Sequence, residues 1–357
     1  MAKIAIVSEL FLPNIGGVEV RFRDLGEAFA KIGHDVHIFT IAHKSNLEKF
    51  ERINNVSIHR IIEDAEYYIP GKKGRKISAI FRFTFALKSH LINFDTVIFG
   101  QWPLLPAIFS NWLISGKKSI RCLDYVEHRS GFLFSIIDYL LFSGTQKQSI
   151  ISDIVFEKIK NRIKQNKAIV VPSSYDGSKY YVKSKQDFLF IGRMEHHKHP
   201  EDAIKTVIAY NQKYKTNYKL QMIGDGNLCA SLKEKYKADC NIAFHGFISD
   251  EDKYAIIAEG KILILPSERE GLPMSIVECM ACGIPTLTTD YINNGSKEFV
   301  INNKLGIVSK PKIDLLVEGL NEILTRYEYF VANNNNYKHN FDLEANAKKY
   351  LKFISQS

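Results

Sequence analysis

Short apolar runs alternate with segments of helical periodicity along most of the chain, and this alternation restricts the fold more than any other feature. The apolar run 3–8 is followed by the segment 19–32, in which apolar residues recur at helical spacing. Gly33 ends this predicted helix, and 36–40 is the next apolar run. Strands that alternate with crossover helices form a parallel sheet covered by helices. The pattern predicts an α/β fold.

The same alternation restarts in the second half and predicts a second α/β domain. Further predicted strands are 96–100, 118–123, 168–171, 188–191, 218–223, 242–244, 262–265 and 286–288. Predicted helices of the second half are 200–214, 228–236, 252–259 and 273–282. The intervening segment is rich in Ser, Tyr, Lys and Asp without a clear period, which is typical of a linker.

We therefore predict two Rossmann-like domains that face each other across a cleft. The first is 1–172, the linker is 173–187, and the second is 188–335. The C-terminal tail and helix, 336–357, are a candidate to pack back on the first domain, after an Asn run at 333–336 that predicts a loop. In such folds ligands bind at the carboxyl ends of the strands.

Size and composition agree with this organisation. A chain of 357 residues exceeds the usual ~100–150 residues of one domain. Its five cysteines are scattered and predict no disulfide framework, which favours a reducing compartment. No signal peptide is evident where Met1, Ala2 and Lys3 lead directly into the first apolar run. We expect a cytoplasmic protein, with peripheral attachment to the inner face of the membrane as a candidate.

The net charge of +9 lies almost entirely in the first 170 residues, which suggests that this half meets an anionic partner. Its densest basic run consists of Lys72, Lys73, Arg75 and Lys76. This run is either a solvated loop or a patch for acidic lipid headgroups. The apolar stretch 132–142 is too short to span a bilayer. We interpret it as a buried helix, and shallow insertion into a membrane surface is the alternative.

The segment 266–285 carries the most specific chemical pattern. The strand 262–265 delivers a loop with Glu270, and Pro273 begins a helix, where its missing N–H costs nothing. The helix start presents free backbone N–H groups at residues 271–274, Pro273 excepted, which favours hydroxyls and anions. Glu278 lies about two turns further along. The two carboxylates therefore reach different parts of one ligand.

This segment resembles glycosyltransferase family 4, a group with the GT-B fold and a Glu-x7-Glu pattern. The family form E-G-(F/L)-(G/P)-x-x-x-x-E-A-M-A-C-G-x-P matches 270–285, and only Cys279 departs from it. The resemblance implies that Glu278 binds the ribose hydroxyls of a nucleotide sugar and that Glu270 lies beside the donor sugar. It further implies that Gly271, Leu272, Pro273 and Met274 line the donor site.

A second element, 190–198, places Arg193 and Lys198 in the loop that enters the next helix. Two cations there suit a diphosphate. The element resembles the family's G-R-x-x-x-x-K-G, in which both residues stabilise the departing nucleotide diphosphate. His199 departs from the family's Gly. The resemblance also implies backbone contacts to the nucleotide from loops at Gly224 and at Gly246 and Phe247.

Two elements of the first half complete the candidate site. Gly16 and Gly17 follow the first strand and let the backbone approach a phosphate, in a loop that resembles the family's G-G-x-E. In the segment 123–131, many relatives carry a His that touches donor sugar or acceptor. His128 is the nearest imidazole here, and Asp124 and Glu127 are alternatives.

Three patterns that resemble metal sites have simpler interpretations. Cys279 and Cys282 lie inside one predicted helix without a second pair. The acidic run 250–252 follows Ser249 at a helix start, where carboxylates are expected. His196, His197 and His199 flank Lys198 in a loop. We predict no metal and no cofactor beyond the donor itself.

The sequence thus predicts a retaining, metal-independent glycosyltransferase that uses a UDP- or GDP-linked sugar, with front-face attack by the acceptor hydroxyl. A saccharide or lipid-linked saccharide acceptor in bacterial surface polysaccharide or glycolipid assembly is the expected context. The alternatives are a phosphorylase or sugar-nucleotide epimerase on the same scaffold, and a non-catalytic nucleotide-sugar-binding partner. No nucleic-acid-binding module is recognised.

Overall fold

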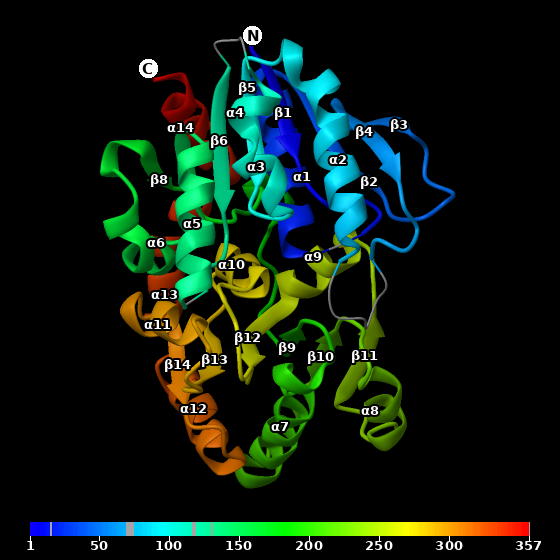
Figure 1. Cartoon of the computed structure of the whole chain (residues 1–357). Coiled ribbons are helices and arrows are strands. Elements are labelled where there is room, and N and C mark those ends of the chain that lie inside the picture. Colours follow the sequence, from blue (N-terminus) through cyan, green and yellow to red (C-terminus); the bar gives the residue numbers. More distant parts are fainter. Residues whose placement is uncertain (15, 69–74, 116–118, 130, 357) are drawn as a thin grey trace. The chain divides into compact units, whose positions relative to one another are not determined.

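The computed structural model describes residues 1–14, 16–68, 75–115, 119–129 and 131–356. The chain divides into two compact units (Figure 1). Unit 1 comprises Met1–Ser174 and the C-terminal segment from Leu343, and unit 2 comprises Tyr175–Asp342. The segment 173–187 is therefore shared between the units, because Ser173 and Ser174 belong to unit 1 and the rest to unit 2.

Unit 1 is an eight-stranded sheet in the order β3-β4-β2-β1-β5-β6-β7-β8, in which only the β3–β4 pair is antiparallel. Its strands are β1 (Lys3–Val7), β2 (Asp35–Ala42), β3 (Phe50–Ile53), β4 (Val56–Glu63), β5 (Thr96–Gly100), β6 (Ile120–Tyr125), β7 (Lys147–Ile150) and β8 (Ala168–Val170). Its α-helices are α1 (Gly17–Ile32), α2 (Ile77–His90), α3 (Leu104–Ile108), α4 (Ser110–Leu113), α5 (Phe132–Gly144), α6 (Asp153–Ile159) and α14 (Leu343–Ser355). Short 3-10 helices cover Leu91–Asn93, Lys160–Arg162 and Gln165–Lys167.

Unit 2 is a six-stranded, wholly parallel sheet in the order β11-β10-β9-β12-β13-β14. Its strands are β9 (Asp187–Ile191), β10 (Leu220–Ile223), β11 (Ile242–Gly246), β12 (Gly260–Leu265), β13 (Thr286–Thr289) and β14 (Gly306–Ser309). Its α-helices are α7 (Pro200–Tyr214), α8 (Cys229–Lys235), α9 (Asp250–Glu259), α10 (Met274–Ala281), α11 (Ser296–Asn302), α12 (Ile313–Thr325) and α13 (Tyr327–Tyr337). Short 3-10 helices cover Gly177–Lys179, His196–Lys198 and Lys338–Phe341.

Both sheets reverse their strand order at one point, which determines where a ligand can bind. In unit 2 the chain proceeds outward from β9 to β10 and β11, and then restarts on the other side of β9 with β12. In unit 1 the corresponding reversal lies between β1 and β5. The loops after these neighbouring strands leave the sheet in opposite directions, so ligands bind at such switch points. The two predicted Rossmann-like sheets are confirmed.

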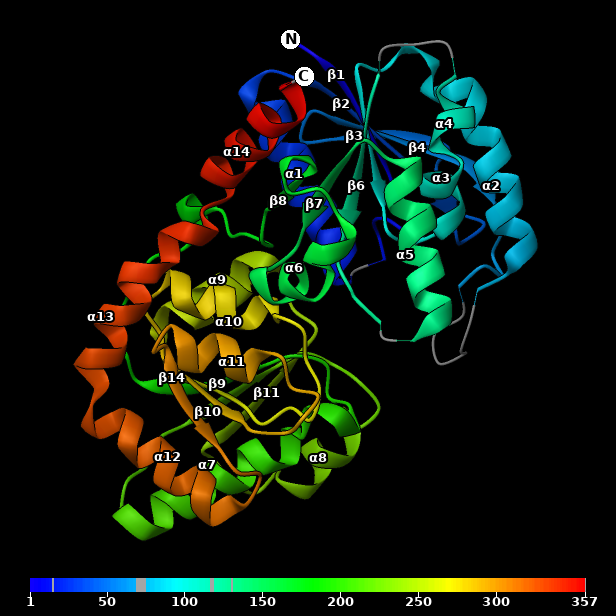
Figure 2. The ribbon, with the colours of Figure 1, turned by 60° about the vertical axis from the view of Figure 1, so that its left-hand side comes forward.

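The strands are nearly continuous apolar runs because helices cover both sides of each sheet. In unit 1, one side packs against α2, α3 and α5, and the other against α1 and α14. The helix α14 packs alongside α1 (Figure 2). The ring of Tyr350 on α14 lies 5.8 Å from that of Phe29, and its hydroxyl lies 3.3 Å from the Cys122 thiol. The last helix is thus part of the core of unit 1.

Two sequence expectations about helices are wrong. The Asn run 333–336 is not a loop but the end of α13, because buried Asn334 donates to the carbonyls of Leu305 and Phe330. The stretch 132–142 forms α5 but is not a buried helix. Only Asp138, Leu141 and Gly144 on α5 are buried. The helix is apolar on every side, so its composition does not reveal which side meets the sheet.

No helix within the described ranges combines the length and apolarity that crossing a bilayer requires.

Candidate functional site

The loops after β9 and β12 meet at the switch point of unit 2. The backbone N–H of Glu268 donates to the carbonyl of His197 at 2.8 Å. The Lys198 ammonium forms an ion pair with the Glu270 carboxylate, and both side chains retain only a small exposed fraction, 13% and 8%. Two residues separated by 72 positions, each singled out from its own motif, are therefore in direct contact.

Arg193 belongs to the same charged group. It is exposed at the end of β9, and His197 lies within the electrostatic reach of Lys198, Arg269, Arg193 and Glu270. Burial lowers the pKa of His197 first, and the neighbouring cations lower it further. His197 therefore stays neutral near pH 7, and the positive charge of the loop resides on Lys198, Arg193 and Arg269.

His199 stands where the family pattern has Gly, and its backbone explains that preference. It adopts the left-handed conformation, with φ of +50°, immediately before α7. Glycine takes this conformation without strain, and His is among the side chains tolerated there. The His199 ring stacks on Tyr291 at 5.4 Å, and its Nδ1 lies 3.1 Å from Asp202. The loop thus keeps its shape, held by the side chain.

A segment that the sequence analysis missed holds the Glu270 backbone in place. The Glu270 N–H donates to the carbonyl of Asn293, and the Gly295 N–H donates to the carbonyl of Glu270. Asn294 is fully buried, and its amide donates to the Thr289 carbonyl and the Thr288 hydroxyl. A Cβ on Gly295 would lie 2.9 Å from the Glu270 carbonyl oxygen, so this approach requires glycine.

Glu278 has a partner that its motif does not reveal. Lys253 on α9 places its ammonium 2.9 Å from Glu278 and 3.0 Å from Asp250. These carboxylates raise the pKa of Lys253 against the opposing effect of burial. Glu278 is buried, and Lys253 balances its negative charge.

The start of α10 agrees with the sequence prediction to within one residue. Pro273 is the N-cap, and the helix begins at Met274. Gly271, Leu272 and Met274 follow Glu270 directly, at the carboxyl edge of the sheet. Gly283 follows the helix with φ of +68°, and its N–H donates to the Met280 carbonyl, as predicted for a C′ glycine.

Two glycines after β10 have a packing reason. A Cβ on Gly224 would lie 2.1 Å from the Gly192 carbonyl oxygen, and one on Gly226 would lie 2.7 Å from that of Met194. The loops after β9 and β10 therefore lie backbone to backbone. The Gly224 N–H also donates to the carbonyl of Gly246, and Phe247 beyond it is 72% exposed. The predicted donor residues of unit 2 share one edge of its sheet.

In unit 1, Gly16 is the N-cap of α1 and Gly17 its first residue. The Glu19 side chain folds back over Gly16, where a Cβ would lie only 2.5 Å from its Oε2. Asn14 donates to Glu19 at 3.1 Å. Burial raises the pKa of Glu19 above its ordinary value. Glu19 is therefore packed beneath the loop and is not a solvated carboxylate at a helix start.

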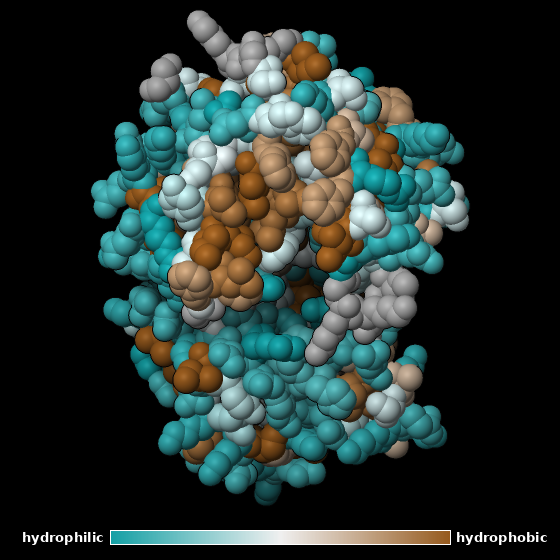
Figure 3. Space-filling model, viewed as in Figure 1, coloured by the Kyte–Doolittle hydropathy of each residue, from teal (hydrophilic) through white to brown (hydrophobic). Residues whose placement is uncertain are grey.

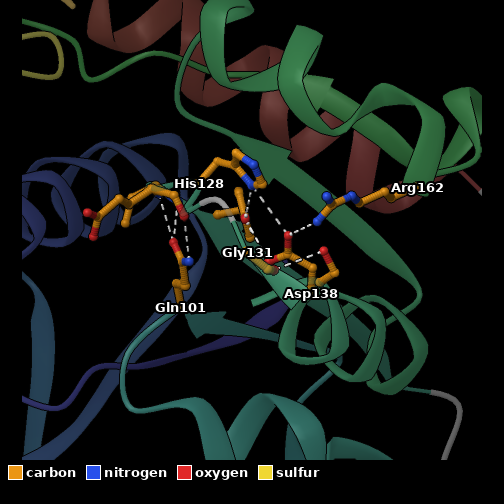
Figure 4. Close-up of polar contacts among 9 residues, drawn as sticks. Gln101, His128, Gly131, Asp138 and Arg162 are labelled. Atoms are coloured by element: carbon orange, nitrogen blue, oxygen red, sulfur yellow. Dashed lines mark hydrogen bonds and ion pairs between the residues drawn. The ribbon is translucent and has the colours of Figure 1, made fainter. Parts of the chain in front are cut away.

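His128 contacts the side chains of Tyr125 and Asp138 within a larger polar network (Figure 4). Its Nδ1 lies 3.4 Å from the Tyr125 hydroxyl and 3.4 Å from Asp138 on α5. Asp138 also accepts from Tyr125 and from Arg162, each at 2.7 Å. Gln101 fixes the backbone that precedes His128, because its amide oxygen accepts hydrogen bonds from the N–H groups of residues 126 and 127. The imidazole is thus oriented by a carboxylate that also pairs with Arg162.

The two alternatives to His128 are engaged elsewhere. Arg21 binds both oxygens of Asp124 at 2.8 Å, and each side chain is 1% exposed. Glu127 pairs with Arg129 at the surface. A carboxylate held by a buried guanidinium is a structural group, so His128 is the better candidate of the three.

Half of the basic run lies outside the described residues, namely Lys72 and Lys73. Arg75 pairs with Glu9 at 3.0 Å and lies over the ring of Tyr68. Lys76 pairs with Asp64 and Glu66. The charges of both are balanced within the chain.

The patterns that resemble metal sites have structural roles. Ser249 caps α9 by accepting from the Asp252 N–H, and the acidic run 250–252 occupies its first turn, as predicted. Cys279 and Cys282 are both buried thiols. Within the described ranges, no group of three or more His, Cys, Asp or Glu side chains could hold a metal ion.

Solved structures with the same two-domain fold are glycosyltransferases. Sucrose-phosphate synthase from Thermosynechococcus elongatus is 17% identical with a TM-score of 0.79, and covers 100% of this chain and 99% of its own. Anabaena HepE in complex with UDP and glucose is 14% identical with a TM-score of 0.73, and covers 100% of both chains. These likenesses show the fold, which is that of the GT-B glycosyltransferases.

Family models and relatives then define the family. The model for Glycosyltransferase Family 4 matches residues 15–177, and that for Glycosyl transferases group 1 matches residues 179–348. The chain is a family 4-type glycosyltransferase.

Two relatives illustrate its range. A Campylobacter jejuni enzyme named GalNAc-alpha-(1->4)-GalNAc-alpha-(1->3)-diNAcBac-PP-undecaprenol alpha-1,4-N-acetyl-D-galactosaminyltransferase is 24% identical over 96% of both chains. The O-antigen biosynthesis glycosyltransferase WbnH of Escherichia coli is 29% identical over 76% of this chain and 79% of its own.

Proposed function

We propose that this glycosyltransferase moves a sugar from a UDP- or GDP-linked donor to a hydroxyl of a saccharide or lipid-linked saccharide, with retention and without a metal ion. The observation that carries the proposal is the contact between Lys198 and Glu270 at the switch point of unit 2. A carboxylate for sugar hydroxyls and a cation for phosphate lie side by side where the fold accepts ligands.

The residues of unit 2 have complementary roles in this proposal. Glu278 binds the ribose hydroxyls, Lys198 and Arg193 bind the diphosphate, and Glu270 with the backbone at residues 271–274 binds the sugar. Because these last N–H groups lie at the start of α10, they also favour a developing negative charge. Gly224, Gly246 and Phe247 border the nucleotide.

The bond between the anomeric carbon and the phosphate oxygen breaks, and its electron pair stays on the leaving diphosphate. Lys198 and Arg193 stabilise this growing charge more strongly in the transition state than in the bound donor, which substitutes for a metal ion. The acceptor oxygen attacks from the face that the diphosphate leaves, and its proton passes to the departing phosphate oxygen. His128 orients the donor sugar or the acceptor, and the backbone at Gly16 and Gly17 approaches a phosphate.

Bacterial surface polysaccharide or glycolipid assembly is the proposed context, supported by relatives named for undecaprenol-linked and O-antigen sugars. A panel of UDP- and GDP-sugars, screened by thermal stabilisation, would identify the donor, because a ligand that binds the folded state raises the melting temperature. NMR of the product then gives the anomeric configuration, and EDTA should leave the rate unchanged. An inverted product, or activity abolished by EDTA and restored by Mg²⁺, would contradict the mechanism.

The alternative functions differ from a transferase in the substrates that they require and the products that they release. A phosphorylase would release a sugar phosphate when inorganic phosphate is supplied, and an epimerase would convert the donor without any acceptor. A non-catalytic binding partner would be stabilised by the donor but release no nucleotide. A transferase releases nucleotide diphosphate in proportion to the glycosylated acceptor.

A further inference from the structure

One face of unit 1 exposes large apolar side chains from three neighbouring helices. The residues that define this apolar face are Phe81 and Phe85 on α2, Trp112 on α4, and Phe132, Leu133 and Tyr139 on α5. Their exposed fractions range from 38% for Trp112 to 85% for Phe132. Figure 3 shows apolar side chains gathered over α5 and its neighbours. Contiguous patches of this kind mark surfaces that bind a partner or a membrane.

The face is continuous because its helices pack against one another. The helix α3 contacts both α2 and α5. The Phe85 and Trp112 rings meet edge to face, with their centroids 5.5 Å apart. Phe81 and Phe85 stand one turn apart on the same side of α2, so they form a ridge. The apolar side chains are therefore presented together rather than scattered.

The charges on these helices favour an anionic partner. The helices α2, α3, α4 and α5 together carry one acidic residue, Asp138. Its side chain is buried and pairs with Arg162. On α2 the basic residues are Arg82, which stays 54% exposed while pairing with Asp64, and Lys88, whose ammonium lies 4.1 Å from the centroid of the Trp112 ring. The helices thus place no carboxylate on the apolar face that would repel a negatively charged surface.

A cavity beside α5 adds a second feature of the same chemistry. It has a volume of about 440 Å³. Apolar parts of Tyr139, Phe142 and Ile163 line it, together with the cationic side chains of Arg162, Lys164 and Lys167, and no acidic residue does. Lys164 and Lys167 are exposed. An apolar wall beside two accessible ammonium groups suits a phosphate attached to a hydrocarbon chain.

We propose that unit 1 docks on an anionic phospholipid bilayer through this apolar face, with Lys164 and Lys167 directed at lipid phosphates. Phe132 and Leu133 at the start of α5 enter the boundary between headgroups and acyl chains, while Trp112 and Tyr139 take the amphipathic positions that such rings prefer. The contact is peripheral, since it uses one face of helices too short to span. The docking deepens the proposed function, because it would bring the enzyme to a lipid-linked acceptor at the membrane surface. Only this role of the docking rests on the proposed function.

Co-sedimentation with vesicles tests the docking. Phosphatidylcholine vesicles are compared with vesicles that also contain phosphatidylglycerol. We expect the chain to bind the anionic vesicles, and the double variant Phe132→Ser/Leu133→Ser to bind them at least about tenfold more weakly, because two apolar side chains no longer leave water. The double variant Lys164→Glu/Lys167→Glu should lose the preference for phosphatidylglycerol.

Matched controls lie on unit 2. Ile301→Ser removes an exposed apolar side chain from α11, and Lys233→Glu reverses an exposed charge on α8, so both should bind vesicles as the parent chain does. Circular dichroism and the melting temperature verify the fold of each variant. The proposal is overturned if Phe132→Ser/Leu133→Ser binds as tightly as the parent. It is also overturned if the parent is a dimer without vesicles and this variant is a monomer, since a second copy then covers the face.

The same preparations separate this proposal from the proposed function. Stabilisation by a nucleotide sugar should be equal in the parent and in Phe132→Ser/Leu133→Ser, because neither residue is among those proposed to bind the donor. If vesicles bind but no nucleotide sugar stabilises the chain or releases nucleotide, the proposed transfer fails and the docking stands. If the donor is used but vesicles are not bound, the docking fails alone.

Discussion

The two sheets have the same kind of switch point but use charge there in different ways. In unit 2, Lys198 and Glu270 pair on loops at the edge, where both remain partly accessible. In unit 1, Arg21 and Asp124 pair beneath the edge, each 1% exposed. A pair at the edge can exchange its hydrogen bonds for those of a ligand, whereas a buried pair has no access to one. Under the proposed function, this difference means that unit 2 binds the charged ligand, whereas unit 1 supplies a rigid support for His128.

The buried pair should give the largest effect. Asp124→Asn leaves the Arg21 guanidinium buried without a counter-charge, which typically costs about 3–5 kcal/mol of unfolding free energy. Urea unfolding would measure it. Glu127→Gln, which breaks an exposed pair in the same segment, should cost less than about 1 kcal/mol. If Asp124→Asn kept its stability but lost transfer activity, Asp124 would be a functional residue and the contrast between the units would fail.

The pair at the edge of unit 2 should affect rate rather than stability. Lys198→Ala removes a cation from the leaving diphosphate, and the loss of one such group typically lowers kcat about 10²–10³-fold. Steady-state kinetics would measure it, with thermal melting to verify the fold. Lys205→Ala is the matched control, because Lys205 lies on α7 and pairs only at the surface, with Glu201. A Lys198→Ala enzyme with full kcat would show that the ion pair with Glu270 is structural.

The sequence predicted the site best where each local motif carries its own backbone signal. The helix 200–214 was predicted with the bounds of α7, because Pro200 marks its first turn and its apolar residues repeat at helical spacing. The sequence also predicted the loop that carries Glu270 and the loop position of Lys198, from the ends of the preceding strands and the spacing of the motifs. Their mutual contact could be expected, since loops after adjacent parallel strands share one edge.

What the sequence could not reveal are partners chosen by tertiary structure. Lys253 occupies an ordinary polar position on α9, and only the packing of α9 against α10 places it beside Glu278. Asn294 and Asn334 look like loop residues, yet both are buried because nearby carbonyls and hydroxyls satisfy their amides. The sequence analysis also failed to predict that most apolar side chains of α5 are not buried. Its sole charged residue, Asp138, points inward because Tyr125 and Arg162 meet it there.

The support for His128 gives a third prediction. His128→Asn should lower kcat about 10²-fold, the usual contribution of a positioned imidazole, with little change in donor affinity. Asp138→Asn should reproduce part of that loss, because Nδ1 would face an uncharged amide. His339→Asn, at an exposed position of unit 2, is the control. Donor binding by thermal shift and kcat by steady-state rates are measured together. If kcat of His128→Asn were unchanged, His128 would not take part in the reaction.

The smallest effect concerns Glu19, which lies beneath the loop at Gly16. Burial raises its pKa, so the folded state holds its proton more tightly than the unfolded state does. The stability this contributes is complete below the ordinary pKa and is lost as pH rises through the folded value. Glu19→Gln keeps the oxygen that accepts from Asn14 without the charge. It should melt higher than the parent near pH 7, by the order of 1 °C, with no gain near pH 4.

Glu318→Gln, at an exposed position of α12, is the control and should change the melting temperature little at either pH. A Glu19→Gln variant that melts lower than the parent near pH 7 would show that the charge is stabilising. The rate of the same variant then decides what the buried carboxylate is for. If the variant is more stable and equally active, Glu19 only supports the loop. If it is more stable but slower, unit 1 keeps a destabilising buried charge because the charge serves the reaction. Both units would then have a functional carboxylate at the edge of the sheet.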